Sequence, residues 1–228
     1  MTTQPHQGFL RDRSVGEIAA AMPGATAVFR KFNVDFCCQG DVVLTEAARQ
    51  RGIDAADLEA ALIALDASDL TAPKSRETEE LIDHILARYH ETHRRELPEL
   101  LELAGKVEAV HANHPQVPGG LADTLLQMLG ELEVHMKKEE LILFPAMRQS
   151  AQVGLEAPIG QMRHDHDDHG ELIRRLESLT DSFTLPEGAC RSWQALYTGT
   201  AKLANDLMEH IHLENNVLFP RYEVGSGS

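Results

Sequence analysis

Aromatic residues are scarce in this sequence of 228 residues, where Phe, Trp and Tyr make up only 5% of the chain. Ala, Leu, Glu and Arg are abundant instead, which favours helices, because β-strands are enriched in aromatic and β-branched side chains. Cysteine is also rare: the chain has three, Cys37, Cys38 and Cys190, two of them adjacent. Such a set does not form the disulfide framework of a small secreted domain. We therefore expect free thiols in a reducing compartment.

Basic residues are outnumbered, with 21 Lys and Arg against 36 Asp and Glu and a formal net charge of −15. This charge repels phosphate backbones and anionic membrane surfaces, so neither nucleic acid nor a membrane is an expected partner. No apolar run approaches the length of a membrane span, and no secretory signal opens the chain. These absences favour a soluble cytoplasmic protein that attracts cations.

Helical patterns divide the chain into two parts. Residues 1–66 carry short helical segments and are expected to form a small helical domain that contains Cys37 and Cys38. Residues 14–17, Ser-Val-Gly-Glu, have the form of a capping box that opens the first helix. The polar residues 66–76 are typical of a linker. Short helices are expected over about residues 14–21, 25–31, 42–51 and 54–65.

Residues 77–223 show much longer helical patterns. Long helices are expected over about residues 77–110, with a bend near Pro98, and over 121–149, 157–181 and 187–222. Short connections between long helices favour an up-down-up-down four-helix bundle. The expected fold class is therefore all-α, a small N-terminal helical domain followed by a C-terminal up-down-up-down four-helix bundle.

The strongest pattern is an internal duplication within this bundle. The second and fourth long helices both read H-x-x-x-E-x-x-x-L-F-P, beginning at His135 and at His210. The helices before them both contain H-x-x-H, beginning at His90 and at His166. The offset between the two copies is almost the same for both motifs. The bundle therefore resembles two copies of one helical hairpin.

The spacing within the repeat predicts a metal site. Residues at i and i+4 share a helix face, so His135 points the same way as Glu139, and His210 the same way as Glu214. Facing inward, these glutamates would be costly to bury without a cation. If each of two metals takes two imidazoles and both glutamates bridge, each has four protein donors. A bridging oxide or hydroxide adds a fifth, and one position stays open. Such donors suit iron or manganese, with zinc as the alternative.

The repeat alone does not choose every histidine among the twelve in the chain. The offset that pairs His90 with His166 equally pairs His93 with His169, so both pairs stay open, and a fifth ligand from the second pair would also fit. The same two helices also carry His84 and His164. Four further histidines are expected on the surface: His6, His111, His114 and His212.

Three carboxylates are candidates for supporting the site. Glu131 lies one turn before the first H-x-x-x-E motif, Asp206 lies one turn before the second, and Asp165 precedes His166. They are either ordinary helix-surface charges or groups that hydrogen-bond to the ligands and relay protons.

Three stretches together resemble a known family. They are Val34-Asp35-Phe36-Cys37-Cys38; Arg88-Tyr89-His90 with the motif from His135 to Glu139; and His166 with the motif from His210 to Glu214, followed by Asn215-Asn216. Nearly the whole chain is similar to the hemerythrin-like iron–sulfur cluster repair proteins, the RIC family of the YtfE and ScdA type.

The resemblance implies a particular centre and role. It implies two non-haem iron ions bridged by Glu139 and Glu214, and it selects the first histidine of each H-x-x-H, not His93 or His169. The implied histidine ligands are His90, His135, His166 and His210. The implied role is the repair of iron–sulfur clusters damaged by nitrosative or oxidative stress in the cytoplasm, with iron–sulfur proteins as clients. Dimers occur in the family, so a homodimer is also compatible with the resemblance.

The paired cysteines depart from the family pattern. Members commonly continue with Gly-Gly, whereas this chain has Gln39-Gly40. Cys37 and Cys38 are either small residues of a packed turn or thiols that handle nitric oxide or iron near the metals. Cys190 is expected on the last long helix, in the core.

Open coordination positions allow two other functions besides repair. One is an enzyme that reduces nitric oxide at the di-iron centre. The other is a scavenger or sensor that binds nitric oxide or oxygen reversibly. No feature of the sequence separates these functions.

Replacing a bridging glutamate tests the predicted centre. We expect Glu139→Ala or Glu214→Ala to lose most of the bound iron, because each substitution removes a donor to both metals. Iron per chain, measured by elemental analysis after anaerobic reconstitution, is the readout. Full iron retention by both variants would reject the bridging assignment.

Overall fold

The computed structural model describes residues 10–65, 76–149 and 154–223. This part of the chain is helical, and its only β-type pairing is an isolated bridge between Ser14 and Val43. The expected all-α class is confirmed. The chain divides into two compact units, Ile82–His210 and a second unit formed by Met1–Leu81 with Ile211–Ser228. Most of the expected linker, residues 66–75, lies outside the described residues, as does His6.

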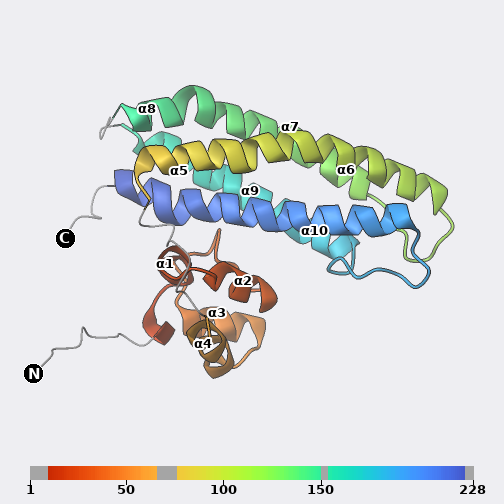
Figure 1. Ribbon diagram of the computed structural model, residues 1–228, viewed down its shortest axis with the longest axis horizontal. Helices are drawn as coiled ribbons and strands as arrows, with labels where there is room; N and C mark the ends of the chain where they lie inside the picture. Colours follow the sequence, from red (N-terminus) through yellow and green to blue (C-terminus); the bar gives the residue numbers. More distant parts are fainter. Residues whose placement is uncertain (1–9, 66–75, 150–153, 224–228) are drawn as a thin grey trace, which may run out of the picture. The chain divides into compact units, whose positions relative to one another are not determined.

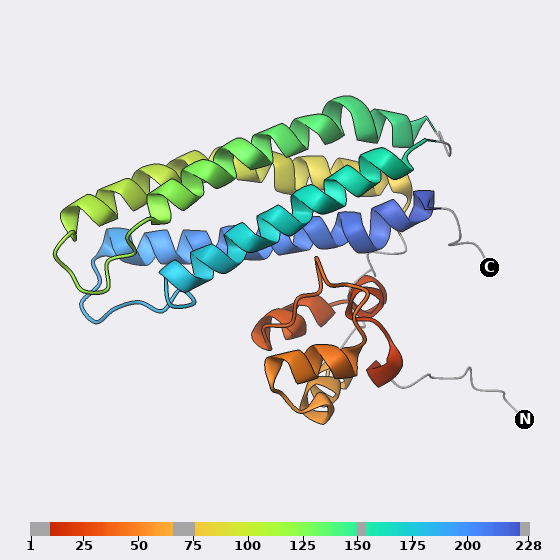
Figure 2. The same cartoon turned by 180° about the vertical axis from the view of Figure 1, so that it is seen from behind.

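The larger unit holds the four-helix bundle. Its long helices lie side by side and alternate in direction, joined by short connections (Figures 1 and 2). The expected up-down-up-down bundle is therefore confirmed. The helical elements are α5 (Thr78–Ile85), η3 (Leu86–His90), α6 (Glu91–Val110), α7 (Leu121–Lys138), η4 (Glu139–Leu143), α8 (Phe144–Arg148), α9 (Glu156–Leu179) and α10 (Arg191–His212).

The hydrophobic periodicity of the sequence explains which faces meet inside the bundle. On α6, Leu97, Leu100, Ala104 and Val107 are buried at the three- and four-residue spacing of one helix face. The helix α7 packs against both α6 and α9. Each fully buried leucine contributes about 1.5–3 kcal/mol, so these apolar layers offset the cost of a polar interior nearby.

Among the described residues, three segments are π-helical, and each contains a residue of the predicted metal site. The π-helix η3 ends at His90, the π-helix η4 begins at Glu139, and the π-helix η5 (Leu213–Leu218) contains Glu214. The helix α6, near whose Pro98 the sequence predicts a bend, stays α-helical across that residue. A π-helical turn adds a residue to the helical repeat, which changes where the following side chain points.

The last long helix begins later than expected, and this corrects the placement of Cys190. Gly188 has a φ of 76°, and α10 starts only at Arg191. Cys190 is therefore half-buried before the helix, and its Sγ lies 3.2 Å from Nε2 of His111. The expectation of a core cysteine on the helix is wrong, because the left-handed glycine turns the chain before the helix can start.

The second unit contains four short helices close to the expected positions. Two have the expected polar caps: Ser14 Oγ accepts from the backbone N–H of Glu17, and Asp54 accepts from that of Ala56. Gly52 ends the third helix in the left-handed conformation. The helices are α1 (Val15–Ala21), α2 (Ala25–Lys31), α3 (Leu44–Arg51) and α4 (Ala55–Ile63).

The end of the chain completes this unit. Asn215 Nδ2 donates to the carbonyl of Cys37, and Asn216 Nδ2 donates to the carbonyl of Phe36, both at 3.0 Å. His212 is fully buried, and its ring lies edge-on to Phe36 at 5.5 Å. The expectation that His212 lies on the surface is therefore wrong, because its ring packs against Phe36 and Asn216 of the same unit.

Gly16 is required by this close packing. Its N–H donates to the carbonyl of Gly40 at 2.8 Å, and a Cβ at position 16 would lie 2.6 Å from Oδ1 of Asn216 and 2.8 Å from the Gly40 carbonyl oxygen. Real Cβ atoms do not approach other heavy atoms so closely, so an alanine there would force the cysteine loop away from the asparagines.

A pair of glycine substitutions tests this packing. Alanine is preferred to glycine inside helices by up to about 1 kcal/mol, yet we expect Gly16→Ala to lower the free energy of unfolding by about 1–3 kcal/mol through overpacking. Gly105→Ala is the matched control, because it also lies in a helix and nothing lies within 4 Å of its added Cβ. Chemical denaturation of both variants measures the difference. Equal stability of the two would contradict the packing argument.

Candidate metal centre

Six side chains from the duplicated motifs meet inside the bundle. Their ligand atoms form two groups, and within each group all atoms lie within 4.8 Å of one another. All six residues are at most 1% exposed. The first group is His90, Glu139, His210 and Glu214, and the second is His135, Glu139, His166 and Glu214. Both glutamates therefore belong to both groups.

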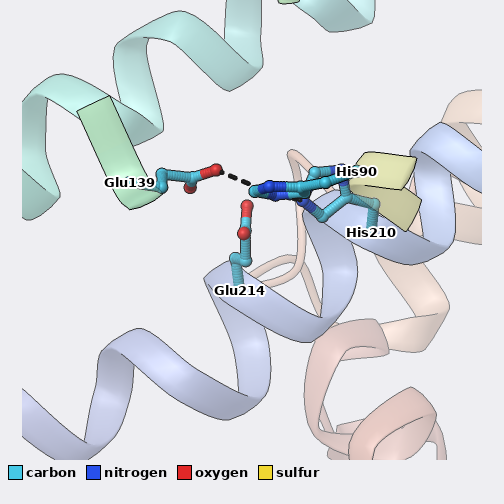
Figure 3. A group of neighbouring side chains, drawn as sticks. All are labelled: His90, Glu139, His210 and Glu214. Atoms are coloured by element: carbon cyan, nitrogen blue, oxygen red, sulfur yellow. Dashed lines mark hydrogen bonds and ion pairs between the residues drawn. The ribbon is translucent and has the colours of Figure 1, made fainter. Parts of the chain in front are cut away.

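Figure 3 shows the first group, in which the side chains converge from different helices. His90 closes the π-helix η3, Glu139 opens the π-helix η4, and His210 and Glu214 lie one turn apart on the last helix and its π-helical continuation. A dashed line joins Glu139 to His90, whose nearest oxygen and nitrogen are 3.3 Å apart.

The histidines meet in two facing pairs. Nε2 of His90 lies 3.2 Å from Nε2 of His210, and Nε2 of His135 lies 3.2 Å from Nε2 of His166. Two nitrogens can bind one metal only if they are closer than twice the metal–nitrogen distance, which is about 2.0–2.1 Å for zinc. The observed separations satisfy this condition, so each pair can serve one metal ion.

Carboxylates outside the centre orient one histidine of each pair. Nδ1 of His90 donates to Glu140 at 2.7 Å, and Nδ1 of His135 lies 3.3 Å from a carboxylate oxygen of Asp165. A proton held on Nδ1 leaves Nε2 as the lone pair that faces the centre. Asp165 was a sequence candidate for such a contact, whereas Glu140 was not.

These two carboxylates are held in the charged state. Burial would raise the pKa of Glu140, but hydrogen bonds from Arg94 and His90 outweigh it and lower the pKa. Burial would likewise raise the pKa of Asp165, but hydrogen bonds from His135 and Lys138 contribute more and lower it. Arg94 binds both oxygens of Glu140, at 2.7 and 3.1 Å. Each orienting carboxylate therefore stays an acceptor for its imidazole.

The other two sequence candidates have different partners. Asp206 accepts from both terminal nitrogens of Arg88, at 2.6 and 3.1 Å, and from Lys202 at 2.8 Å. The Arg88 guanidinium lies over the Tyr89 ring, which stacks on His210 at 5.5 Å. Asp206 is therefore linked indirectly to His210, through Arg88 and Tyr89. Glu131 is exposed and accepts from Gln127.

The second histidines of the H-x-x-H motifs are buried beside the ligands. His93 stacks on His210 at 5.5 Å, and His169 lies edge-on to His135 at 4.9 Å. Burial lowers the pKa of His93 well below its usual value and that of His169 to about 2, so both rings are neutral. Neither belongs to the two groups of ligand atoms. His84 and His164 also lie outside those groups.

The cysteine pair forms a third group with Asp35. The two sulfurs are 3.6 Å apart and share a hydrogen bond without forming a disulfide, and Cys37 also donates to Asp35. Cys37 is buried, whereas Cys38 is half-buried. The hydrogen bond with Cys38, together with burial, raises the pKa of the Cys37 thiol well above its usual value. Cys37 is therefore held as a thiol, and Cys38 is the more accessible sulfur of the pair.

The donor set fits a metal centre. Two carboxylates with no solvent exposure would cost several kcal/mol each to keep ionised in an apolar interior, and four imidazoles alone do not balance them. A multivalent cation does, and mixed imidazole and carboxylate donors suit iron, manganese or zinc. The fold and the site together define a metal-binding four-helix bundle.

Comparison with known proteins identifies the family. Residues 81–222 match the hemerythrin HHE cation binding domain, and residues 11–66 match ScdA_N, a domain of unknown function. The iron-sulfur cluster repair protein YtfE of Musicola paradisiaca is 47% identical over 213 residues, 92% of this chain and 96% of the relative. The protein of the same name from Citrobacter koseri is 46% identical over 220 residues, which cover 94% of this chain and 98% of the relative. The chain therefore belongs to the family of the YtfE iron–sulfur cluster repair proteins, and its bundle is a hemerythrin HHE domain.

One further finding concerns membranes. Within the described ranges, no helix combines the length and the apolar character that a bilayer span needs.

Sequence reasoning missed Glu140 and Arg94, although a signal for them exists. Glu140 directly follows Glu139, and Arg94 directly follows the first H-x-x-H motif. The second repeat has Asn215 and Gly170 at the corresponding positions. An acid and a base that occur in only one copy of a repeat point to a contact present in only one half.

Removing the Glu140 contact tests its orienting role. We expect Glu140→Gln to weaken iron binding by roughly 10- to 100-fold, because the imidazole of His90 loses the carboxylate that fixes its tautomer. Glu133→Gln is the matched control, since Glu133 also binds Arg94, at 2.7 Å, but is not the partner of His90 Nδ1. Competition with a calibrated iron chelator measures the affinity. Equal losses in both variants would show that Arg94, rather than His90, needs the contact.

Proposed function

We propose that this protein repairs damaged iron–sulfur clusters by supplying iron held at a dinuclear centre in the bundle. The observation that carries the proposal is the pair of overlapping ligand groups that share Glu139 and Glu214. The names of relatives that are 45–47% identical over more than nine-tenths of this chain support the repair role.

The shared glutamates support two metal ions rather than one. Each facing pair of histidines offers two nitrogens, and each glutamate has two oxygens, so one oxygen can serve each metal. We propose two non-haem iron ions bridged by both glutamates and by an oxide or hydroxide. Iron bound there supplies a releasable cation and an open position for a small ligand such as nitric oxide or oxygen.

The chain's own residues set how firmly the cation is held. Glu140 and Asp165 orient His90 and His135, while Glu139 and Glu214 neutralise the positive charge. With both glutamates bridging, the six side chains give each ion four protein donors, fewer than the six donors that iron commonly takes. A centre with few protein donors binds iron less tightly than a fully enclosed site, and this suits a protein that gives iron away.

We propose that the cysteine pair handles small ligands or iron on behalf of this centre. Cys38 is the sulfur available for this, because Cys37 is buried and held as a thiol. The adjacent carboxylate of Asp35 completes a group of three metal-binding side chains. This role is secondary to that of the histidine and glutamate donors.

Iron transfer to a client protein tests the repair function. We expect the reduced di-iron protein, mixed anaerobically with the apo-form of an iron–sulfur protein and a sulfide source, to restore the client cluster while losing iron. The client's visible absorption and the iron left on this protein are measured together. Glu139→Ala, reconstituted in parallel, is the control and should transfer little iron because it holds little.

Nitric oxide added to the same reduced protein separates the alternatives. Catalytic formation of nitrous oxide over many turnovers, with iron retained and no cluster restored, would replace repair by a nitric oxide reductase. Stoichiometric, reversible binding without iron loss would instead indicate a scavenger or sensor.

A further inference from the structure

A cysteine and a histidine meet at the end of the bundle where α6 ends and α10 begins. Sγ of Cys190 lies 3.2 Å from Nε2 of His111, and both residues are half-buried. Figures 1 and 2 show these two helix ends at the same end of the bundle. Among the described residues, neither belongs to a group of three or more metal-binding side chains. The pair therefore has too few donors for a metal, but it has the composition of a nucleophile with its base.

The two helix ends bring opposite partial charges to the pair. Cys190 directly precedes the 22-residue helix α10, and its carbonyl accepts from the backbone N–H of Gln194 at 2.9 Å, so it is the N-cap residue. His111 is the C-cap residue of α6, and its backbone N–H donates to the carbonyl of Val107. A helix N-terminus stabilises a negative charge, and a C-terminus stabilises a positive one. When the thiol proton moves to the imidazole, the thiolate and the imidazolium each stand at the helix end that stabilises them.

The neighbours of the pair support this proton transfer. The first turn of α10 contains no acidic residue, so no carboxylate of that turn competes for the positive helix end. Arg191, the next residue after the cysteine, is exposed and adds a positive charge near the sulfur. The ring of His111 packs against Trp193, which is 1% exposed, with the ring centroids 4.9 Å apart. The buried indole limits the positions that the imidazole can adopt beside the sulfur.

We propose that Cys190 is a site of reversible thiol–disulfide exchange with a small disulfide, with His111 as its base. The thiolate sulfur attacks one sulfur of the disulfide, the S–S bond of the reagent breaks, and a new S–S bond joins Cys190 to one half of it. Cys190 is oxidised, and the departing half is reduced to a thiol that takes the proton held on His111. An excess of small thiol reverses the reaction. The exposed Arg191 suits a disulfide that carries carboxylates, such as oxidised glutathione.

This site is remote from the metal centre. His90 lies about 20 residues before His111 along one helical stretch, and His210 lies 20 residues after Cys190 on α10. An α-helix rises about 1.5 Å per residue, so each of these separations corresponds to about 30 Å. The inference therefore goes beyond the proposed repair function, and its test needs neither a client protein nor iron transfer.

The rate of modification in the native protein tests the proposal. The full-length, metal-loaded protein is reduced, freed of small thiols and mixed anaerobically with oxidised glutathione, and peptide mass spectrometry follows each cysteine over time. We expect Cys190 to react about tenfold faster in the native protein than in the same protein unfolded in urea, because an unassisted thiol is only a few per cent thiolate at pH 7. Half-burial without a base would slow the native reaction. A native rate equal to or below the unfolded rate would overturn the proposal.

A pair of histidine substitutions identifies the base. We expect His111→Gln to lower the native rate by about tenfold, because glutamine is polar but cannot accept the thiol proton. His114→Gln is the matched control, since His114 is also half-buried and its ring also contacts Trp193, at 5.1 Å. The control variant should react at the unmodified rate. Equal rates in the two variants would contradict the role of His111 and overturn the proposal. If His111→Gln does not fold, the comparison of native with unfolded protein decides alone.

Discussion

Burial of two carboxylates among four imidazoles is the constraint on which this structure depends. An ionised carboxylate in an apolar interior costs several kcal/mol, and Glu139 and Glu214 are both fully buried. The apolar layers of α6 and α7 contribute stability that offsets part of this cost. A bound cation compensates the two negative charges at their buried positions. The bundle and the metal centre therefore depend on each other, because the helices align the donors and the cation compensates their charge.

The duplicated hairpin has kept its ligands but not their surroundings. Each half brings an H-x-x-H helix and an H-x-x-x-E helix, and each facing pair of nitrogens is separated by the same 3.2 Å. The partners differ, since Glu140 with Arg94 supports His90, while Asp165 with Lys138 supports His135. The two candidate ligand groups therefore have equivalent donors in unequal surroundings.

The cysteine loop contacts the residues that directly follow a candidate ligand. Asn215 and Asn216 come immediately after Glu214 and hold the carbonyls of Cys37 and Phe36. Gly16 and Gly40 permit this approach because they have no Cβ to meet Asn216. A change in the backbone around Glu214 is therefore coupled to the cysteine loop through two hydrogen bonds. The replacement of the family's first glycine by Gln39 leaves this contact intact, because Gly40 is the residue that must be small.

The sequence by itself determined the all-α class, the duplication and the histidine–glutamate spacing, because helical periodicity and the i, i+4 relation are local properties of a chain. The repeat spacing left His90 with His166 and His93 with His169 equally open, since all four histidines are buried and helical spacing does not say which rings reach Glu139 and Glu214. Only the tertiary structure grouped His90 and His166 with both glutamates, brought Glu140 to His90 and buried His212. Each of these joins residues on different helices, and their meeting is set by the packing of whole elements rather than by local spacing.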